Sequence, residues 1–513
     1  EFAEGATCVC TAPAAGTYPT RDFVVEPIVS TDWYVNPEGD DDKDGFTPDT
    51  AMKTFEMVMA KVEEGDTVHA ARGIYNEGFS TPPETATGAA NRARVYVEHD
   101  GVTLVADEGR DVTFIEGEDA PSGANANGQG VGAMRCVYVV RGAKNVRIKG
   151  FTFRKGRTAA IANDPGGAVW CDNGKVAASA RTVCEDCCFT NNIAYFGGAT
   201  CAGVCMNCTF IDNKCSKNRA VSSGTDMYGC YFDRNVGTTD QGVVYGASAV
   251  VNCTFGPDNK TSAGAPIGAI GSPNAGSEVR NCVILCANFA RIGGTTGCKT
   301  TIYNCAFANG VTETEDVVMH GTEPIYVTAD CIDASGRPVG KDSALVDAGD
   351  NVVLENSADY IGAKTLDAGQ RVYNGTIDIG AFEYDWRADY AAAIGGGVTV
   401  TDATPGVELA GGKVRLADGA AIAGVWPEGD AARNSQYTVT EKASNGTLTG
   451  AFVSGDDVVS ARSVTDRSTS ETFKAKVASL DWSYAFAATG DDGYAEVGPF
   501  AYTPPSGLML IVR

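Results

Sequence analysis

The sequence predicts an all-β protein in two parts, a solenoid of short stacked strands followed by a β-sandwich. Three observations support this prediction. A motif built on Asn-Cys-Thr-Phe recurs through the middle of the chain, with its cysteines 21 to 29 residues apart. Glycine makes up 62 of the 513 residues, which indicates many turns. The last part of the chain consists of β-type runs separated by Gly, Asn, Asp and Ser, and has no cysteine after Cys331.

Two columns of apolar residues define the repeat. In each copy a cysteine is followed two residues later by Phe or Ile, an alternation typical of a strand with one buried face. The aligned cysteines are Cys187, Cys208, Cys230, Cys253, Cys282 and Cys305. The residues two positions later are Phe189, Phe210, Phe232, Phe255, Ile284 and Phe307. Because stacked coils lie about 4.8 Å apart, we expect each column to point inward and each residue to contact its copy in the next coil.

A second, glycine-rich motif lies between the copies, as in "GGAVWC" from Gly166 and "GGATC" from Gly197. Each period therefore carries at least two short strands joined by turns, and periods of this length indicate a β-solenoid. The alternation of Phe-x-x-Asn with Gly-Gly-Ala resembles the repeats of chlamydial polymorphic outer-membrane proteins. That resemblance implies a right-handed parallel β-helix and a role as a surface adhesin.

Residues 31–66 are predicted to cap the solenoid after an N-terminal arm of residues 1–30. The cap contains a short strand at Trp33, an acidic turn, and an amphipathic helix over Thr50 to Glu64. The first strand after the cap is "DTVHAA". This order is similar to the N-terminal cap of secreted bacterial pectate-lyase-like β-helix proteins. The predicted fold class is therefore all-β, with a right-handed parallel β-helix over residues 67–385 behind an N-terminal helical cap.

Three motifs downstream mark the predicted end of the β-helix. They are "SALVDAGDN" from Ser343, "LDAGQRVYNG" from Leu366 and "DIGAFEYD" from Asp378. They resemble the closing region of secreted bacterial β-helix proteins of the choice-of-anchor Q type, where this region precedes varied surface-anchoring tails. A linker over residues 386–397 then leads to the predicted C-terminal β-sandwich of residues 398–513.

The composition argues against several classes of function. The net charge of −25 repels phosphate backbones, so neither nucleic acid nor an anionic membrane is an expected partner. No run of 18 apolar residues occurs, so no membrane span is expected. The chain has only three histidines, His69, His99 and His320, and they are scattered. A histidine-based catalytic triad or metal cluster is therefore disfavoured.

Sixteen of the 18 cysteines lie between Cys136 and Cys331. We expect most of them to be buried thiols that act as small hydrophobic residues. Disulfides, which secretion permits, and a metal site are the alternatives. Cys188 is expected to face outward, in the same column as Thr209, Tyr231 and Thr254 of later coils. Cys8 and Cys10 belong to the N-terminal arm.

An acidic run in the cap is a candidate calcium site. Asp40, Asp42 and Asp44 precede Gly45 with the spacing Asp-x-Asp-x-Asp-Gly, and alternate carboxylates around such a turn can surround Ca²⁺. The EF-hand pattern then requires Glu six residues after the glycine, where Ala51 stands. The alternative is a solvated turn of the cap. No other cofactor is expected.

Polysaccharide lyases with a β-helix fold use Ca²⁺-binding acids and an Arg or Lys base in a lateral groove. The resemblance to pectate-lyase-like proteins raises the question of whether this chain has such a site. The candidates for such a site are Arg219, Asp233, Arg234, Asp240, Arg280 and Arg291. They do not recur in one column, and the acidic surface of the protein repels polyuronates. A non-enzymatic role is therefore favoured, and a lyase or glycan-binding enzyme is the alternative.

Two apolar terminal segments are candidates for self-association. They contain Phe23, Val24 and Val25 near the N-terminus, and Leu508, Met509, Leu510, Ile511 and Val512 at the C-terminus. An exposed apolar strand invites pairing with the sheet edge of another subunit, and the alternative is that each segment folds back on its own domain. The sequence thus predicts a secreted or cell-surface bacterial protein with a structural or adhesive role. It is expected to assemble into filaments or to contact a glycan or host surface.

Overall fold

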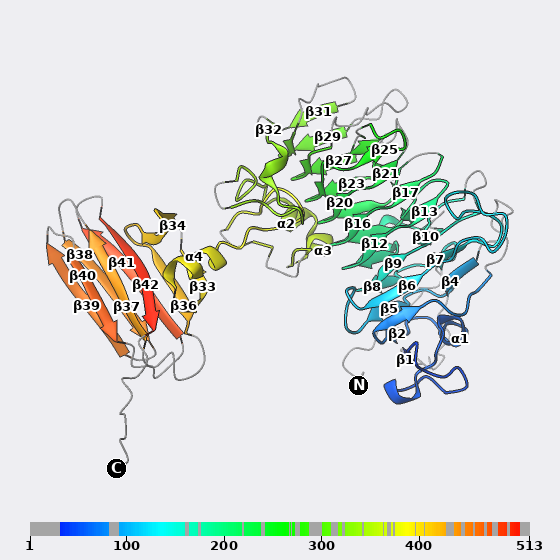
Figure 1. Cartoon of the computed structure of the whole chain (residues 1–513), viewed down its shortest axis with the longest axis horizontal. Coiled ribbons are helices and arrows are strands. Elements are labelled where there is room, and N and C mark those ends of the chain that lie inside the picture. Colours follow the sequence, from blue (N-terminus) through cyan, green and yellow to red (C-terminus); the bar gives the residue numbers. More distant parts are fainter. Residues whose placement is uncertain are drawn as a thin grey trace, which may run out of the picture. The chain divides into compact units, whose positions relative to one another are not determined.

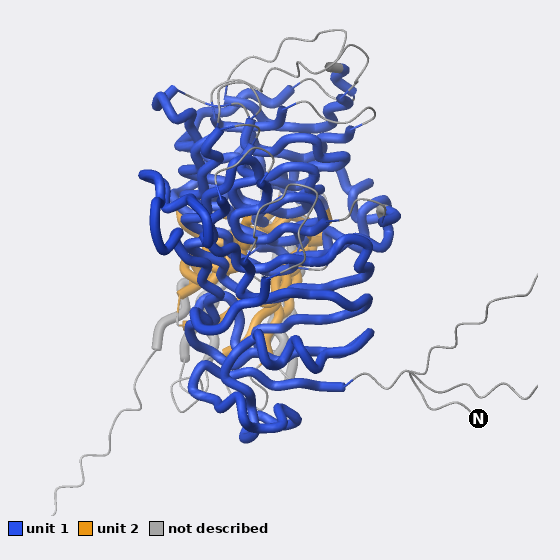
Figure 2. The backbone as a smooth tube through the Cα atoms, turned by 90° about the vertical axis from the view of Figure 1, so that its right-hand side faces the viewer, with its two compact units in different colours: residues 1–371, 376–383 blue, residues 372–375, 384–513 orange. Residues whose placement is uncertain are grey.

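Successive coils of the chain stack their strands in parallel, which builds a β-helix with four sheets, A to D (Figure 1). The computed structural model of the 513-residue chain divides into two compact units, residues 1–371 with 376–383 and residues 372–375 with 384–513 (Figure 2). The structure describes residues 31–81, 92–159, 164–172, 176–217, 220–237, 242–265, 267, 269–271, 277–286, 300–308, 317–320, 324–340, 343–362, 364–366, 371–372, 375–395, 397–404, 406–426, 435–442, 447–454, 457–465, 469–474, 481–489 and 493–502.

The described strands of the β-helix form parallel sheets of 11, 10, 7 and 4 strands. Sheet A contains β1 (Asp32–Val35), β2 (Thr67–Ala70), β5 (Thr103–Ala106), β8 (Arg147–Lys149), β11 (Val183–Glu185), β15 (Val204–Met206), β19 (Asp226–Tyr228), β23 (Ala249–Val251), β27 (Ser277–Arg280), β29 (Thr300–Tyr303) and β31 (Val317–His320). Sheet B contains β3 (Gly73–Tyr75), β6 (Thr113–Glu116), β9 (Thr152–Arg154), β12 (Cys188–Thr190), β16 (Thr209–Ile211), β20 (Tyr231–Asp233), β24 (Thr254–Phe255), β28 (Val283–Ile284), β30 (Ala306–Phe307) and β32 (Ile325–Tyr326).

The two smaller sheets take part in only some of the coils. Sheet C contains β4 (Arg92–Val97), β7 (Met134–Val139), β10 (Val169–Cys171), β14 (Thr200–Cys201), β18 (Ser222–Ser223), β22 (Val244–Tyr245) and β26 (Ile270–Gly271). Sheet D contains β13 (Ile193–Ala194), β17 (Lys214–Cys215), β21 (Val236–Gly237) and β25 (Lys260–Thr261). Short 3-10 helices, η2 (Ala178–Ala180) and η3 (Ala329–Cys331), lie in the connections. The predicted parallel β-helix is confirmed.

The asparagine of the Asn-Cys-Thr-Phe motif makes the sharp turn from sheet A to sheet B. Asn207, Asn252, Asn281 and Asn304 all have φ between 49° and 53°, in the left-handed region that asparagine tolerates better than most residues. The turn is so short that the cysteine after it already points into the core. This explains why a strand motif begins with Asn-Cys.

Phenylalanine rings stack along the interior of sheet B. The ring centroids of Phe153, Phe189, Phe210, Phe232 and Phe255 follow one another at 5.3, 4.7, 4.6 and 4.7 Å. Ile284 and Phe307 continue the column in the same register. The six cysteines of the other column are also buried, next to the rings, and all are free thiols. Both columns therefore lie in the core of the β-helix.

A third column consists of the asparagines of Phe-x-x-Asn, namely Asn192, Asn213 and Asn235, together with Asn259, which follows its phenylalanine by four residues, and the column is fully buried. Asn213 Oδ1 accepts hydrogen bonds from the backbone N–H and the Nδ2 of Asn192, at 3.1 and 3.0 Å. The next two pairs of the column repeat this pattern. A side-chain amide both donates and accepts, so identical residues satisfy one another from coil to coil.

The N-terminal cap covers the first coil with η1 (Pro48–Thr50) and α1 (Phe55–Met59). The helix is shorter than the predicted span of Thr50 to Glu64. Met52 pairs with Val35 as an extended bridge, and Asp41 accepts the backbone N–H groups of residues 53 and 54, so the chain is not helical there. Thr54 then caps the helix by accepting the N–H of Met57 at 3.3 Å.

Residues 343–362, 364–366, 371 and 376–383, which we call the closing strap, run along the outer face of sheets A and B. The strap includes α2 (Val353–Asn356) and α3 (Ala358–Ile361). Tyr360 of α3 stacks on Tyr228 with centroids 4.8 Å apart, and Phe382 meets the edge of Tyr231 at 5.9 Å. Tyr228 and Tyr231 are consequently buried although they point away from the core. The outward column of Cys188 is therefore covered in its later coils.

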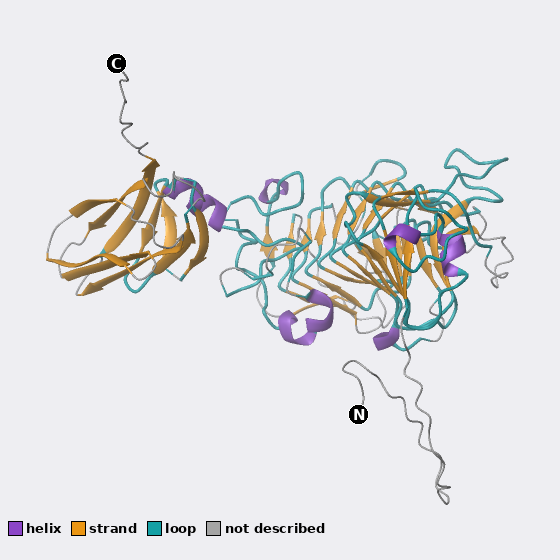
Figure 3. Ribbon diagram, turned by 90° about the horizontal axis from the view of Figure 1, so that it is seen from below, coloured by secondary structure: helices purple, strands orange, loops and turns teal. Residues whose placement is uncertain are grey.

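The second unit contains α4 (Arg387–Ile394) and two antiparallel five-stranded sheets, a β-sandwich as predicted (Figure 3). One sheet contains β33 (Thr399–Ala403), β36 (Ala421–Val425), β41 (Asp481–Thr489), β38 (Thr447–Ser454) and β39 (Asp457–Thr465). The other contains β34 (Val407–Ala410), β35 (Lys413–Leu416), β42 (Tyr494–Tyr502), β37 (Ser435–Lys442) and β40 (Thr469–Lys474). Trp426, Trp482 and Tyr484 fill its core. Among the described residues, no helix is long and apolar enough to cross a membrane.

Candidate functional site

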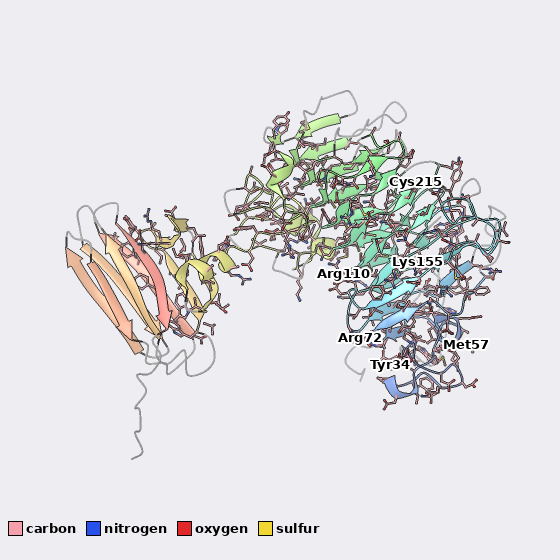
Figure 4. The ribbon with its side chains drawn as sticks, in the orientation of Figure 1. Tyr34, Met57, Arg72, Arg110, Lys155 and Cys215 are labelled. Carbon is pink, nitrogen blue, oxygen red and sulfur yellow. The ribbon has the colours of Figure 1, made fainter. Side chains whose placement is uncertain are left out.

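A polar cleft of about 560 Å³ opens on the side of the β-helix where the strands of sheet B end. Most of its lining lies at or just after the ends of β3, β6, β9 and β12, in four successive coils, and Arg94 comes from β4 of sheet C. With coils about 4.8 Å apart, the cleft crosses roughly 14 Å of the solenoid. We call it the lateral cleft; Lys155, one of its residues, is labelled in Figure 4. The lining residues are Asn76, Arg94, Glu116, Gly117, Glu118, Asp119, Lys155, Arg157 and Asn191.

Two glycines allow the coils to approach closely beside the cleft. A Cβ atom on Gly117 would lie 2.3 Å from the backbone oxygen of Met134, and one on Gly156 would lie 2.0 Å from the backbone oxygen of Gly167. Any larger residue would therefore collide with backbone. This tight packing fixes the positions of the polar residues on either side of these glycines, of which Glu116 and Arg157 are buried.

Glu116 is the buried acid of the cleft. Its Oε1 accepts a hydrogen bond of 2.6 Å from Arg154 Nε, and its Oε2 accepts one of 3.0 Å from Lys155 Nζ. Glu116 of β6 is in register with Arg154 of β9, so parallel pairing itself places the opposite charges side by side. The Arg154 guanidinium also lies 4.2 Å from the centre of the Phe114 ring, a cation–π contact.

Arg94 is buried at the base of the cleft. Its Nε donates to the backbone oxygen of Glu116 at 3.0 Å, and its Nη1 donates to the backbone oxygen of Gly78. Its Nη2 lies 3.8 Å from Oε2 of Glu118, whose side chain is 63% exposed. Burial lowers the pKa of Arg94, since desolvation disfavours the charged form. The pairing with Glu118 joins the base of the cleft to its rim.

Arg157 connects two further parts of the lining. Its Nε lies 2.9 Å from Oδ1 of Asp119, and its Nη1 donates to the backbone oxygen of Asn191 at 2.7 Å. Burial also lowers the pKa of Arg157. Because Asp119 follows β6 and Asn191 follows β12, this one side chain spans three coils.

The cleft as a whole is polar and balanced in charge. Three of its lining residues are acidic and three are basic, and each acid has a cationic partner. Such an arrangement presents carboxylate oxygens as acceptors and guanidinium N–H groups as donors at fixed positions. Hydroxyl groups can hydrogen-bond to both. Chemically, the cleft suits an uncharged, hydroxyl-rich ligand better than an ion of either sign.

Of the residues considered for a lyase site, the structure describes three, and it places Arg280 on a different sheet from Asp233 and Arg234. Asp233 and Arg234 lie at the end of β20 in sheet B, whereas Arg280 lies in β27 of sheet A. Arg234 forms an ion pair with Asp212 at 3.1 Å, and Arg280 lies 3.7 Å from the centre of the Tyr303 ring. Burial raises the pKa of Asp233. The other three candidates, Arg219, Asp240 and Arg291, lie outside the described residues.

The acidic run of the cap forms tight turns. Asp40 Oδ1 accepts the N–H of Asp42, and Asp44 Oδ1 accepts the N–H of Phe46, each at 3.1 Å. A side-chain hydrogen bond from Thr50 lowers the pKa of Asp44. In the described part of the chain, no three His, Cys, Asp or Glu side chains are grouped so that they would hold a metal ion. Calcium binding at Asp40, Asp42 and Asp44 stays a prediction.

The remaining sequence candidates have no shared location. His69 stacks on Tyr34 and lies 2.8 Å from Asp107, while His320 stacks on Tyr303 far along sheet A. The proposed assembly residues Phe23, Val24, Val25, Leu508, Met509, Leu510, Ile511 and Val512 lie outside the described residues, as do Cys8 and Cys10. Self-association through them stays a prediction.

None of the lateral cleft residues is singled out by the repeat pattern. The only signal in the sequence is a pair of oppositely charged strand ends in consecutive coils, "EGED" from Glu116 and "RKGR" from Arg154. These two stretches precede the cysteine-rich copies that define the repeat, so an alignment on the cysteines misses them.

Comparison with known proteins finds no matching family model and no matching curated protein. Among solved structures, a rhamnogalacturonan lyase is 15% identical with a TM-score of 0.30, covering 54% of this chain and 74% of its own. The GH136 lacto-N-biosidase from Eubacterium ramulus is 11% identical with a TM-score of 0.22, covering 59% and 53%. Tailspike protein 4 of bacteriophage CBA120 is 10% identical with a TM-score of 0.19, covering 87% and 65%. Likenesses of this degree carry no argument about what the chain does, so its function has to be inferred from its own geometry.

Proposed function

We propose that the chain is a non-enzymatic adhesive protein of the bacterial surface or secreted space, and that its lateral cleft binds an uncharged glycan. The observation that carries this proposal is the charge-paired lining of the cleft, in which Glu116, Glu118 and Asp119 each have a cationic partner. A glycan offers many hydroxyl groups along an extended chain, which matches a polar cleft that crosses several coils. The net charge of −25 disfavours polyanionic ligands.

The rest of the β-helix supports a binding role without turnover. Asp233 and Arg280, which the sequence offers for lyase chemistry, lie on different sheets and have structural partners. The strap occupies the outer face of sheets A and B over several coils. The surface adhesin and anchoring roles that the repeat and closing-region resemblances imply are part of this proposal.

The proposal is tested by calorimetric titration of the whole protein with neutral and with acidic oligosaccharides. We expect binding to neutral ones, and a loss of about tenfold in affinity, or 1.4 kcal/mol, in Asp119→Asn, which removes one charged hydrogen-bonding group. Glu108→Gln, the same carboxyl-to-amide change at a residue outside the cleft lining, is the control and is expected to bind as wild type. Equal affinity in Asp119→Asn and wild type, or binding to acidic oligosaccharides alone, contradicts the proposal.

A polysaccharide lyase acting in the same cleft is the second candidate. It is favoured by the burial of Arg94 and Arg157, because a lowered pKa is the direction an arginine needs to act as a base. A lyase leaves a double bond in its product, so ultraviolet absorbance during incubation with acidic polysaccharides separates the two candidates. Absorbance that rises with wild type and not with Arg157→Gln would establish the lyase.

Self-association through the terminal segments is the other part of the proposal. Apolar strand-like segments such as Phe23 to Val25 are suited to pairing with a sheet edge of a second copy. Light scattering of the full chain and of a variant without residues 1–27 tests this. We expect assemblies from the full chain and monomers from the shortened one; monomers from both would remove self-association from the proposal.

A further inference from the structure

The closing strap carries two buried carboxyl groups at the place where it contacts the β-helix. The side chains of Asp378 and Glu383 belong to residues that are only 2% and 6% exposed. Asp378 Oδ1 accepts the backbone N–H of Asp347 at 2.7 Å. Both carboxyl oxygens of Glu383 accept the backbone N–H of Asp378, at 3.2 and 3.0 Å. The two acids therefore fix the backbone of the strap at Asp347 and Asp378 through hydrogen bonds.

The backbone that begins at Asp378 is also the part of the strap that contacts the β-helix. Asn252 Nδ2 donates to the backbone oxygens of Asp378 and Gly380, at 3.0 and 3.2 Å. The N–H of Gly380 donates to the backbone oxygen of Asn281 at 2.8 Å, and the N–H of Ala381 donates to Thr254 Oγ1 at 2.9 Å. Any change in the charge of the two acids thus acts directly on the contacts between the strap and two coils.

The charged groups that face this pair, among the described residues, are Asp347 and Arg371. Arg371 is buried, and its Nη2 donates to Asn207 Oδ1 and to the backbone oxygen of Lys364, each at 3.0 Å. One guanidinium therefore faces three carboxyl groups. Full ionisation leaves an excess of negative charge in a buried site, which is unfavourable.

We propose that Asp378 and Glu383 form a pH-dependent latch that holds the closing strap on the β-helix while the pair carries a proton and loosens it when both groups are ionised. Burial raises the pKa of Asp378 to about 7. Burial, together with repulsion from Asp378, raises the pKa of Glu383 to about 9. Arg371 opposes both shifts without cancelling them.

The direction of the pH effect follows from proton binding. Aspartate and glutamate in an unfolded chain titrate near pH 4, so the docked strap binds protons more tightly than a released strap. Docking is then fully favoured below about pH 4 and loses free energy as the pH rises through about 7 and about 9. This is the reverse of the usual behaviour of carboxylates in salt bridges, which stabilise a fold at neutral pH.

Release of the strap would change the surface of the β-helix. Tyr228 and Tyr231, which the strap buries, lie on the outer face of sheets A and B. Loss of the contacts with Tyr360 and Phe382 would expose them. The latch would thus cover an aromatic surface in acid and uncover it in alkaline conditions, and it does so independently of the lateral cleft.

Hydrogen–deuterium exchange of the whole protein at pH 6 and pH 9 tests the latch, with rates corrected against the unfolded chain at each pH. We expect the protection of peptides from residues 376–383 to fall at least about tenfold, the factor that corresponds to one unit of pKa shift. Peptides around Phe210, in the core of the β-helix, serve as the internal reference and are expected to keep their protection. Unchanged protection of the strap between the two pH values in wild type overturns the proposal, without any variant.

Glu383→Gln sharpens the test because the amide oxygen can still accept the N–H of Asp378 while the side chain stays neutral. We expect its strap to lose less protection between pH 6 and pH 9 than the wild-type strap, because only Asp378 can then ionise. Asp359→Asn removes an acid on an exposed part of the same strap and is expected to loosen with pH as wild type does. A strap that loosens equally in Glu383→Gln and Asp359→Asn also overturns the latch.

Discussion

The core columns and the lateral cleft follow opposite rules, although both are built from equivalent positions of successive coils. In the core, identical side chains stack on one another: the ring centroids of Phe189, Phe210 and Phe232 follow at 4.7 and 4.6 Å. In the cleft, residues of opposite charge are neighbours, and Glu116 of one coil lies beside Arg154 of the next. Apolar rings and amides gain from stacking on identical groups, whereas identical charges in adjacent strands repel. The core columns therefore recur visibly in the sequence, whereas the charged residues of the cleft differ from coil to coil.

The strongest way to break the core pattern is to remove one ring. Phe210→Ala should lower the free energy of unfolding by about 3–5 kcal/mol, because a fully buried phenylalanine is replaced by a cavity between two rings. The loss is measured by urea unfolding. Phe46, which is 53% exposed on the cap, gives the matched control, and Phe46→Ala should cost far less.

The damage from Phe210→Ala should also stay local, because each coil contacts only its neighbours. Limited proteolysis should cut first within residues 190–240. First cleavage within the β-sandwich, with residues 190–240 intact, would show that the ring column does not carry the packing described above.

Breaking the asparagine column should have the next largest effect on stability. Asn213→Ala removes the acceptor of the Asn192 backbone N–H and of its Nδ2, and leaves both buried donors without that partner. A buried unsatisfied group costs about 1–3 kcal/mol, so we expect a loss of about 2–4 kcal/mol by urea unfolding. Asn356→Ala, on an exposed turn of α2, is the control. Equal stability of the two variants would mean that the column is not a structural ladder.

This contrast explains what the sequence predicts and what it does not. The cysteine and phenylalanine columns, the cap and the β-sandwich are visible because their residues recur or alternate with a fixed period. The path of the closing strap cannot be predicted in this way, because Tyr360 and Tyr228 are 132 residues apart in the chain and no local sequence pattern marks their contact. The length of α1 is decided by Met52 bridging to Val35, a contact that helical periodicity ignores. The lateral cleft draws single charged residues from different coils, so no motif marks it.

The charge pairing in the cleft is broken by reversing the charge at Glu116, its buried acid. Glu116→Lys places a third cation beside Arg154 and Lys155, and like charges in neighbouring strands destabilise a sheet by up to about 1 kcal/mol. We expect a loss of about 1–2 kcal/mol, since the hydrogen bonds of Glu116 are also removed. Glu118→Lys makes the same charge change at an exposed rim position and should cost about 0–1 kcal/mol. A larger loss in Glu118→Lys would show that the buried pairing of Glu116 is not the stronger interaction.

The smallest expected effect concerns the cysteine column, where a reductant should not change stability. Cys208 Sγ–H donates to the backbone oxygens of Met206 and Cys184 at 3.2 and 3.4 Å, so the thiol is satisfied without a disulfide. Stacked parallel neighbours also run their Cβ vectors side by side, which fits the dihedral of a disulfide poorly. Burial raises the pKa of Cys208 to about 11, which keeps it a neutral thiol and slows oxidation.

We therefore expect Cys208, Cys230 and Cys253 to resist a thiol reagent in the folded protein and to react fully once it is denatured without reductant. Urea unfolding with and without reductant should give the same midpoint. Mass spectrometry of the labelled peptides identifies each site. Cysteines of this column that stay unlabelled in the denatured, non-reduced protein would reveal cross-linked coils. The core would then be held in part by covalent bonds between neighbouring coils, and not by the packing of free thiols alone.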